Sequence, residues 1–235
     1  MPINITNPPP VLETYFLDEA RIIPTAKWTH TDVNVGFLGS RFKRFTGTGI
    51  TAGWAMTVKC LPGDILPTFL AMQFIRDRIA QGRWVLVLVT DGQPGESDAA
   101  HWNYMQSRMA FEAGFVGAVI GGMVQDVDEI NEKLENGFGV FAYGTSPLSP
   151  SNTPEGVVGS PIKINDVIIN SGDLIIGDND GVICVPRDMV ESVLHAARER
   201  IILEVNQLQH VREGLGAVEV LELTDILKGN VELVD

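Results

Sequence analysis

Two polar segments near the middle of the chain carry residue types that could do chemistry. The first covers residues 91–98, includes Glu96, and leads to His101. The second covers residues 121–126 and ends in Asp126. Carboxylates and a histidine can transfer protons, and carboxylate oxygens are the ligands that Mg²⁺ prefers in proteins. Both segments are therefore candidates for acid–base or metal chemistry.

Each of these segments also has a purely structural interpretation. Asp126 could cap a helix that begins near Val127, because aspartate is a favoured N-cap residue. Glu96 and Asp98 could be ordinary solvated loop charges. The sequence alone leaves both interpretations open.

The elements around the two segments predict a parallel sheet. The apolar runs at 84–90, 115–122 and 138–144 predict strands, the first of them buried on both faces. Polar helices are expected between them, at 103–114 and 126–137, each ending in glycine. Ligands bind parallel sheets at the carboxyl ends of the strands, so both polar segments should lie at one rim.

The remaining chain predicts one domain in three parts. Residues 1–50 form an N-terminal segment packed on the core, which covers residues 51–186; residues 187–235 form C-terminal helices in a subunit contact. Within the last part a long helix is expected over 187–212, with one apolar face. The basic run 41–44 is expected to be a solvated face or a subunit contact.

Composition excludes several classes of protein. The chain has 235 residues and a formal charge of -13, which argues against nucleic acid and anionic membranes as nonspecific partners. Cys60 and Cys184 stand far apart in apolar runs, so both are expected to be buried thiols. No secretory signal and no apolar run of membrane-spanning length occurs, which predicts a soluble, cytoplasmic protein.

Motifs for other chemistries are missing from the sequence. There is no dinucleotide fingerprint, no phosphate-binding P-loop and no nucleophile elbow. His195 falls in the long helix, where a surface role is the simplest interpretation; His101 lies in a candidate site loop.

Four segments resemble the family of regulator of ribonuclease activity A, the RraA-like proteins, which includes the 4-hydroxy-4-methyl-2-oxoglutarate aldolases. They are VLVLVTDG at 85–92, AFEAGFVGAVIGGMVQDVDEI at 110–130, FGVFAYGTSP at 138–147 and SGDLIIGDNDGVICVP at 171–186. The last is the most specific. The resemblance implies an α/β class, an α/β/α sandwich of the RraA-like (swivelling phosphohistidine-domain-like) type, here with a long C-terminal helix.

The resemblance also implies an assembly and a reaction. Members assemble as homotrimers or as dimers of trimers (homohexamers), with active sites between subunits. In the aldolases, Mg²⁺ or Mn²⁺ binds a 2-oxo acid and acts as a Lewis acid on the enolate left by C–C cleavage. The diagnostic motif is an acidic residue, twenty residues, then Arg-Asp.

This sequence departs from that motif at two positions. Tyr104 stands where the first acid is expected, and Gln125 replaces the arginine before Asp126. Asp126 is then the expected metal ligand, while Gln125 can donate a hydrogen bond but carries no charge. The substrate loop becomes Asn103-Tyr104-Met105-Gln106, whose backbone amides could still hold a carboxylate at a helix N-terminus.

Compensating groups and a partner residue complete the expected site. Glu96, Asp98 and His101 could supply ligands or acid–base groups. Glu204 aligns with an acidic residue that aldolases contribute from the adjacent subunit, although a solvated helix face also explains it.

Three hypotheses about function follow from these residues. The first is a metal-dependent lyase for aldol cleavage or decarboxylation of a 2-oxo acid or related small carboxylate. The second is a non-catalytic trimeric ring that binds a protein partner, as the founding regulator binds a ribonuclease. The third is a different reaction on the same scaffold with Glu96 or His101 as base.

Overall fold

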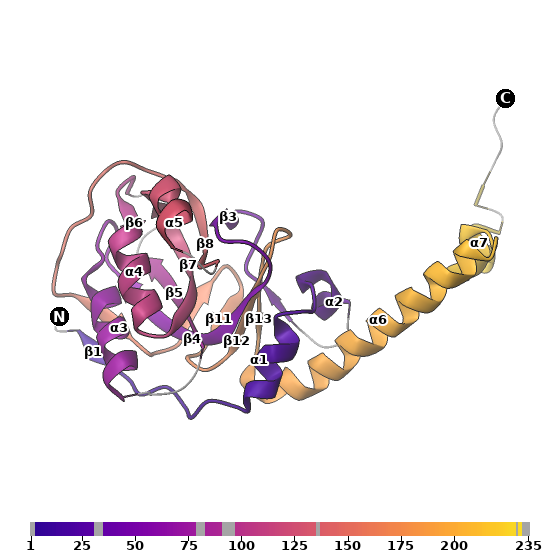
Figure 1. The fold of residues 1–235 in the computed structure, drawn as a ribbon, viewed down its shortest axis with the longest axis horizontal. Helices are drawn as coiled ribbons and strands as arrows, with labels where there is room; N and C mark the ends of the chain where they lie inside the picture. The colour runs from indigo at the N-terminus through magenta and orange to yellow at the C-terminus, as the bar shows by residue number, and fades with distance from the viewer. Residues whose placement is uncertain are drawn as a thin grey trace.

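The computed structural model describes residues 3–30, 35–78, 83–90, 97–134, 137–228 and 230–231. Within these residues the chain forms a mixed sheet with a long helix that leaves the body (Figure 1). Of the positions predicted to do chemistry, Glu96 lies outside the described residues.

The centre of the sheet is four parallel strands, and antiparallel strands extend it on both sides. The central strands are β4 (Thr51–Cys60), β5 (Trp84–Thr90), β7 (Phe115–Val124) and β8 (Gly139–Thr145). Beyond β4 lie β12 (Leu174–Gly177), then β13 (Val182–Val185), then β2 (Gly36–Phe37) at the edge. Beyond β8 lies β3 (Lys43–Thr46). The short strands β1 (Asn4–Ile5), β6 (Ala100–Trp102) and β9 (Gly156–Val158) complete it, while β10 (Ile162–Ile164) and β11 (Val167–Ile169) form a separate hairpin.

Register explains why the central strands are apolar along most of their length. Val87 pairs with Val119, and Val119 pairs with Phe141. These three side chains face the hairpin side of the sheet, in one core cluster with Ile162 and Ile169. The next row, Leu88–Ile120–Ala142, faces the helical side. Both faces are therefore buried, as continuous apolar strands require.

Helices cover one face of the sheet. They are α1 (Thr14–Ala20), α3 (Leu66–Arg78), α4 (Tyr104–Glu112), α5 (Val127–Lys133) and the start of α6 (Val190–Arg212), which follows a 3₁₀ turn, η1 (Arg187–Met189). α2 (Thr25–Thr29) packs against α6. α7 (Ala217–Val220) and α8 (Thr224–Leu227) follow α6 at its far end (Figure 1).

Only the first half of α6 is buried. Val190, Val193, Leu194 and Ala197 pack into the core, whereas Leu208 and Val211 are about half exposed. The second half projects away from the body and carries the C-terminal segment with it (Figure 1).

The α/β class and the long C-terminal helix are confirmed, and both cysteines are free and buried as predicted. Two details differ from the prediction. Residues 100–102 form β6 inside the segment predicted as loop, and α5 ends at Lys133, four residues before the predicted Gly137. No helix in the described part of the chain is both long and apolar enough to cross a membrane.

Candidate active site

A pocket of about 640 Å³ lies at the carboxyl ends of β7 and β8. We call it the rim pocket. Its lining comes from the end of β7, the start of α5 and the end of β8: Val124, Gln125, Asp126, Val127, Asp128, Glu129, Thr145, Ser146 and Pro147. This is the edge at which parallel sheets bind ligands, and it is the rim predicted for the second polar segment.

Asp126 has an unusual backbone in this pocket. Its φ of 59° and ψ of 31° are left-handed, a conformation that costs free energy for any residue with a Cβ, although Asp tolerates it better than most. Asp126 occupies the N-cap position of α5, but its side chain makes no capping hydrogen bond there. The capping interpretation is therefore wrong, and the carboxylate is exposed and free to serve another role.

The Asp126 carboxylate faces the N-terminus of the neighbouring helix α4. The backbone N–H of Tyr104 donates to its Oδ2 at 3.3 Å. α4 begins here because Asn103 caps it: the Asn103 Oδ1 accepts from the Gln106 N–H at 2.9 Å. The structure thus brings together three of the predicted positions, Asn103, Tyr104 and Asp126, in the way that a helix N-terminus binds an anion.

Gln125 has a fixed backbone and an unsatisfied side-chain oxygen. Its N–H donates to the Trp102 carbonyl at 2.9 Å, which ties β6 to the end of β7. Its Oε1 is buried and has no hydrogen-bond partner among the described residues. A buried polar atom without a partner is costly and is a common mark of a site that completes itself with a ligand.

The charges around the rim pocket are mainly negative. Asp126, Asp128 and Glu129 line it, and Lys133 pairs with Glu129 at 2.6 Å. The Lys133 ammonium also lies 5.4 Å from the centre of the Tyr104 ring. The hydrogen bond to Glu129 raises the pKa of Lys133, so this cation already has a carboxylate partner. A small carboxylate would need an added cation to bind next to these acids.

His101 is buried behind the rim pocket and is not part of its lining. The Gly63 N–H donates to its Nε2 at 2.8 Å, and the Met123 N–H approaches Nδ1 at 3.4 Å. Burial lowers the pKa of His101, against an opposing effect of Asp64. In a neutral ring only one of these two contacts can be a hydrogen bond, because the other nitrogen carries the proton. The ring lies between the loop at Gly63 and β7; its role as an acid–base group stays a prediction.

The other predicted site residues are dispersed. Met105 is exposed, and Tyr104 is partly buried against the core. Glu204 binds Lys27 and Arg200 of its own chain, and these hydrogen bonds lower its pKa. Within one subunit Glu204 is thus an ion-paired residue on α6, away from the rim pocket lining.

Sequence reasoning missed the lining from β8. Thr145 ends β8, which runs parallel to β7, and Ser146 and Pro147 follow it, so all three reach the same edge of the sheet. The available signal was the polar end of the third predicted strand, which by position belongs to the same rim as Asp126. The Ser146 side chain also caps its own turn, accepting from the Leu148 N–H at 3.2 Å.

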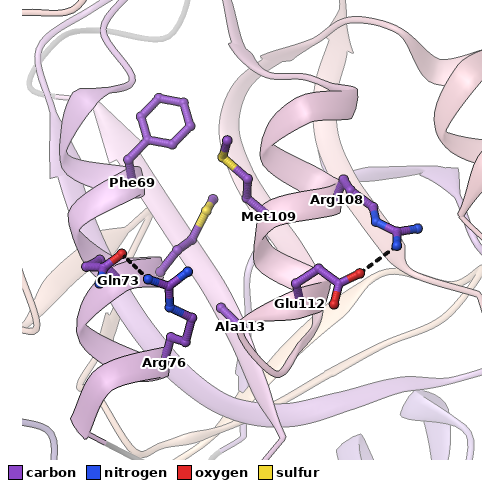
Figure 2. A pocket seen from close by; sticks show the side chains of 8 residues that line it. Phe69, Gln73, Arg76, Arg108, Met109, Glu112 and Ala113 are labelled. Carbon is purple, nitrogen blue, oxygen red and sulfur yellow. Dashed lines mark hydrogen bonds and ion pairs between the residues drawn. The ribbon is translucent and has the colours of Figure 1, made fainter.

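A second hollow lies between α3 and α4 and has a different character (Figure 2). It measures about 490 Å³, and its apolar part is formed by Phe69, Met72, Met109 and Ala113. Its polar groups pair with each other: Arg76 donates to Gln73 at 2.9 Å, and Arg108 pairs with Glu112 at 2.6 Å. Among the described residues that line it there is no unpaired carboxylate and no histidine, so we assign it no chemistry.

The fold and the rim pocket define an α/β protein whose site lies at the carboxyl ends of parallel strands. A family model described as RraA-like, "Aldolase/RraA", matches residues 26–184. Because this match covers more than half of the chain, the chain belongs to the RraA-like family.

Individual relatives agree with this assignment. A protein of Halalkalibacterium halodurans named "Putative 4-hydroxy-4-methyl-2-oxoglutarate aldolase" is 30% identical over 188 residues, which is 80% of this chain and 84% of that protein. A solved structure of an uncharacterized protein from Pseudomonas syringae matches with a TM-score of 0.72 at 21% identity, covering 91% of this chain and 95% of that one. The RNA-processing inhibitor RraA from Thermus thermophilis matches with a TM-score of 0.58 at 24% identity, covering 69% and 92%.

Proposed function

We propose that this protein is a divalent-metal-dependent lyase that cleaves a C–C bond of a 2-oxo acid, by aldol cleavage or decarboxylation. One observation carries the proposal. The Asp126 carboxylate lies at the edge of the sheet formed by the carboxyl ends of the parallel strands, on a left-handed backbone, and it does not cap the helix that it precedes. Backbone strain of this kind persists at functional sites, where the surrounding structure enforces it.

The donor set suits a hard cation held largely by water. The described residues contain no group of three or more His, Cys, Asp or Glu side chains that could hold a metal, which argues against a closed protein cage. Mg²⁺ and Mn²⁺ accept oxygen ligands, and Mg²⁺ is commonly held by one or two carboxylates plus waters and substrate. The Asp126 carboxylate and the unpartnered Gln125 Oε1 are such oxygens. When bound, the ion supplies the positive charge that a developing negative charge on the keto oxygen needs.

The side chains around Asp126 then bind and orient the substrate. The N-terminus of α4 would present its positive dipole end to a substrate carboxylate. Two of its N–H groups already have acceptors in the protein, since Tyr104 donates to Asp126 and Gln106 donates to Asn103. Gln125 can hydrogen-bond to the substrate but cannot neutralise it. An arginine at this position would contribute a charge-assisted bond, and losing such a donor commonly lowers the rate by about 10²–10³-fold. Weak activity, or a substrate with less charge, is the expected consequence.

We also propose that the active form is a homotrimer or a dimer of trimers. Support comes from an apolar stripe on α6 that recurs at steps of four and three residues and is interrupted at Glu204. Its members are Val190, Leu194, Ala197, Ile201, Leu208 and Val211. This spacing is the heptad pattern of a helix that packs along a partner. The chain's own core covers the first half of the stripe, while Leu208 and Val211 are exposed, and a second subunit would cover them.

Pyruvate release tests the enzyme proposal. Purified protein with Mg²⁺ or Mn²⁺ is given 4-hydroxy-2-oxo acids and oxaloacetate. Turnover should require the metal and should be lost in Asp126→Asn, which keeps the shape of the side chain. Asp128→Asn, at the second residue of α5 in the same pocket, is the matched control and should retain most activity. Absence of turnover with both metals, or full activity in Asp126→Asn, contradicts the proposal.

A second candidate function is a non-catalytic ring that binds a protein partner. The neutral Gln125 and the absence of a multi-residue ligand cluster in the described residues favour it, as does the likeness to a structure titled an RNA-processing inhibitor. This candidate would be supported over the lyase if the protein binds no Mn²⁺ and, used as bait in a pull-down, recovers a ribonuclease.

A further inference from the structure

A pocket of about 310 Å³ lies at the opposite edge of the sheet from the rim pocket. It is formed where β4, β5 and β7 begin and where the chain enters β8. We call it the arginine pocket, because Arg21 and Arg83 both line it. Eight residue steps along β7 separate Val116 in this pocket from Val124 in the rim pocket, which corresponds to about 26 Å of strand.

The charge of the arginine pocket is the reverse of the protein's. The chain carries 30 acidic and 17 basic residues, yet none of the described residues that line this pocket is an Asp or a Glu. Among the described residues neither Arg21 nor Arg83 has an ion-pair partner. Other arginines do pair with carboxylates: Arg76, Arg108, Arg198 and Arg200. Two arginines that share a cavity without a counter-charge leave a site with net positive charge, which attracts an anion.

The walls of this pocket are held in place by backbone contacts. The Arg83 carbonyl accepts from the Trp54 N–H at 2.8 Å, which fixes Arg83 at the point where β5 joins β4. Gly53 allows this approach, because a Cβ there would lie 2.9 Å from the same oxygen. The loop that carries Thr48 is held by a hydrogen bond from the Gly47 N–H to Asn131 Oδ1 at 3.2 Å. A site fixed before binding loses little entropy when a ligand enters.

The rest of the lining is mostly apolar. Ile50, Phe111, Val116 and Phe138 form this part, and Phe138 belongs to the buried core. Thr48 and Thr51 add hydroxyl groups next to the arginines. Guanidinium groups bind carboxylates and phosphates through paired N–H donors, and an apolar wall suits a carbon skeleton. The combination selects an anion attached to an apolar body over a bare inorganic ion.

We propose that the arginine pocket binds a small organic anion, a carboxylate or a phosphate monoester carried on an apolar group. Arg21 and Arg83 contact the anionic oxygens, and the wall formed by Phe111 and Phe138 contacts the carbon skeleton. The site is separate from the rim pocket and does not depend on the proposed lyase activity. α4 connects the two pockets, since Tyr104 at its start contacts Asp126 and Phe111 near its end lines the arginine pocket.

Calorimetric titration of the full chain tests this proposal with four probes: phenyl phosphate, phenylacetate, inorganic phosphate and the neutral benzyl alcohol. Phenyl phosphate or phenylacetate should bind a single class of sites more tightly than inorganic phosphate, and benzyl alcohol should not bind. The comparison of the first two probes identifies the preferred head group. Arg83→Gln and Arg21→Gln should each weaken binding about tenfold or more, as expected for a lost charge-assisted hydrogen bond.

Matched controls make the result decisive. Arg76→Gln removes the same charge from an exposed arginine outside the pocket and should leave affinity unchanged, as should Asp126→Asn in the rim pocket. Arg21 is exposed, so its variant should fold even if Arg83→Gln does not, which a melting curve checks. Absence of saturable binding of both organic anions, equal weakening in Arg76→Gln, or unchanged affinity in Arg21→Gln would overturn the proposal.

Discussion

Replacing Asp126 by glycine and by alanine tests whether the backbone of the rim pocket is strained at this residue. Both variants remove the carboxylate and the hydrogen bond from Tyr104, so they differ only in the Cβ atom. At most positions alanine is the more stabilising of the two by about 0.5–1 kcal/mol, because glycine loses more chain entropy on folding. At φ 59° the order should invert, because a Cβ in the left-handed region costs about 1–2 kcal/mol.

The expected difference in the free energy of unfolding is therefore about 1 kcal/mol in favour of Asp126→Gly. For a chain of this size that corresponds to roughly 2–4 °C in melting temperature. Asp126→Asn should stay close to the unsubstituted protein, since asparagine also tolerates this backbone and can accept from the Tyr104 N–H. All three variants should lose Mn²⁺ binding.

Thermal unfolding by circular dichroism, at matched protein concentration and without metal, measures the order. The strain argument fails if Asp126→Ala is as stable as Asp126→Gly or more stable. It also fails if Asp126→Asn is as unstable as the alanine variant, because the loss would then come from the missing charge.

Three further predictions concern the surrounding structure. Gly122→Ala should lower the free energy of unfolding by about 1–3 kcal/mol, because its Cβ would lie 2.4 Å from His101 Nδ1. Gly216→Ala is the control and should be close to neutral, because its Cβ would lie 3.7 Å from the nearest atom, Glu219 Oε2. Burial lowers the pKa of His101, so below about pH 6.5 the unfolded chain binds a proton that the native state resists. The free energy of unfolding should therefore fall as pH decreases through that range. Chemical denaturation of His101→Gln should show a flatter pH dependence of this free energy, and an unchanged slope would refute the argument. The double variant Leu208→Glu/Val211→Glu should sediment with a lower mass than the unsubstituted protein in sedimentation velocity, whereas Asn206→Glu should not. If the unsubstituted protein sediments as a monomer, the proposed assembly is contradicted.

Much of the fold could be predicted from local sequence patterns. The runs at β5, β7 and β8 are apolar along most of their length because both faces of the sheet are buried, and that pattern needs no knowledge of distant contacts. The glycine after α4 was equally informative: Gly114 adopts a φ of 94°, which stops the helix where predicted. β6 was missed because three residues following a polar loop show no periodicity, and its pairing with β7 arises only in the folded chain.

The candidate site could be located but not described from sequence. The strand ends indicated which rim Asp126 would occupy, yet its left-handed backbone and its contact with Tyr104 depend on α4 packing next to α5. The partners of His101 lie 38 and 22 residues away along the chain, so its burial was invisible to local reasoning. The β8 contribution to the pocket likewise follows from strand order.

A crystal soaked with Mn²⁺ and pyruvate tests the central claim most directly. The lyase proposal predicts an anomalous peak at coordinating distance from the Asp126 carboxylate, with the pyruvate carboxylate toward the N-terminus of α4. The same soak of Asp126→Asn should show no peak there. A rim pocket that stays free of manganese at saturating concentration, or a metal bound elsewhere with Asp126 uninvolved, would contradict the account.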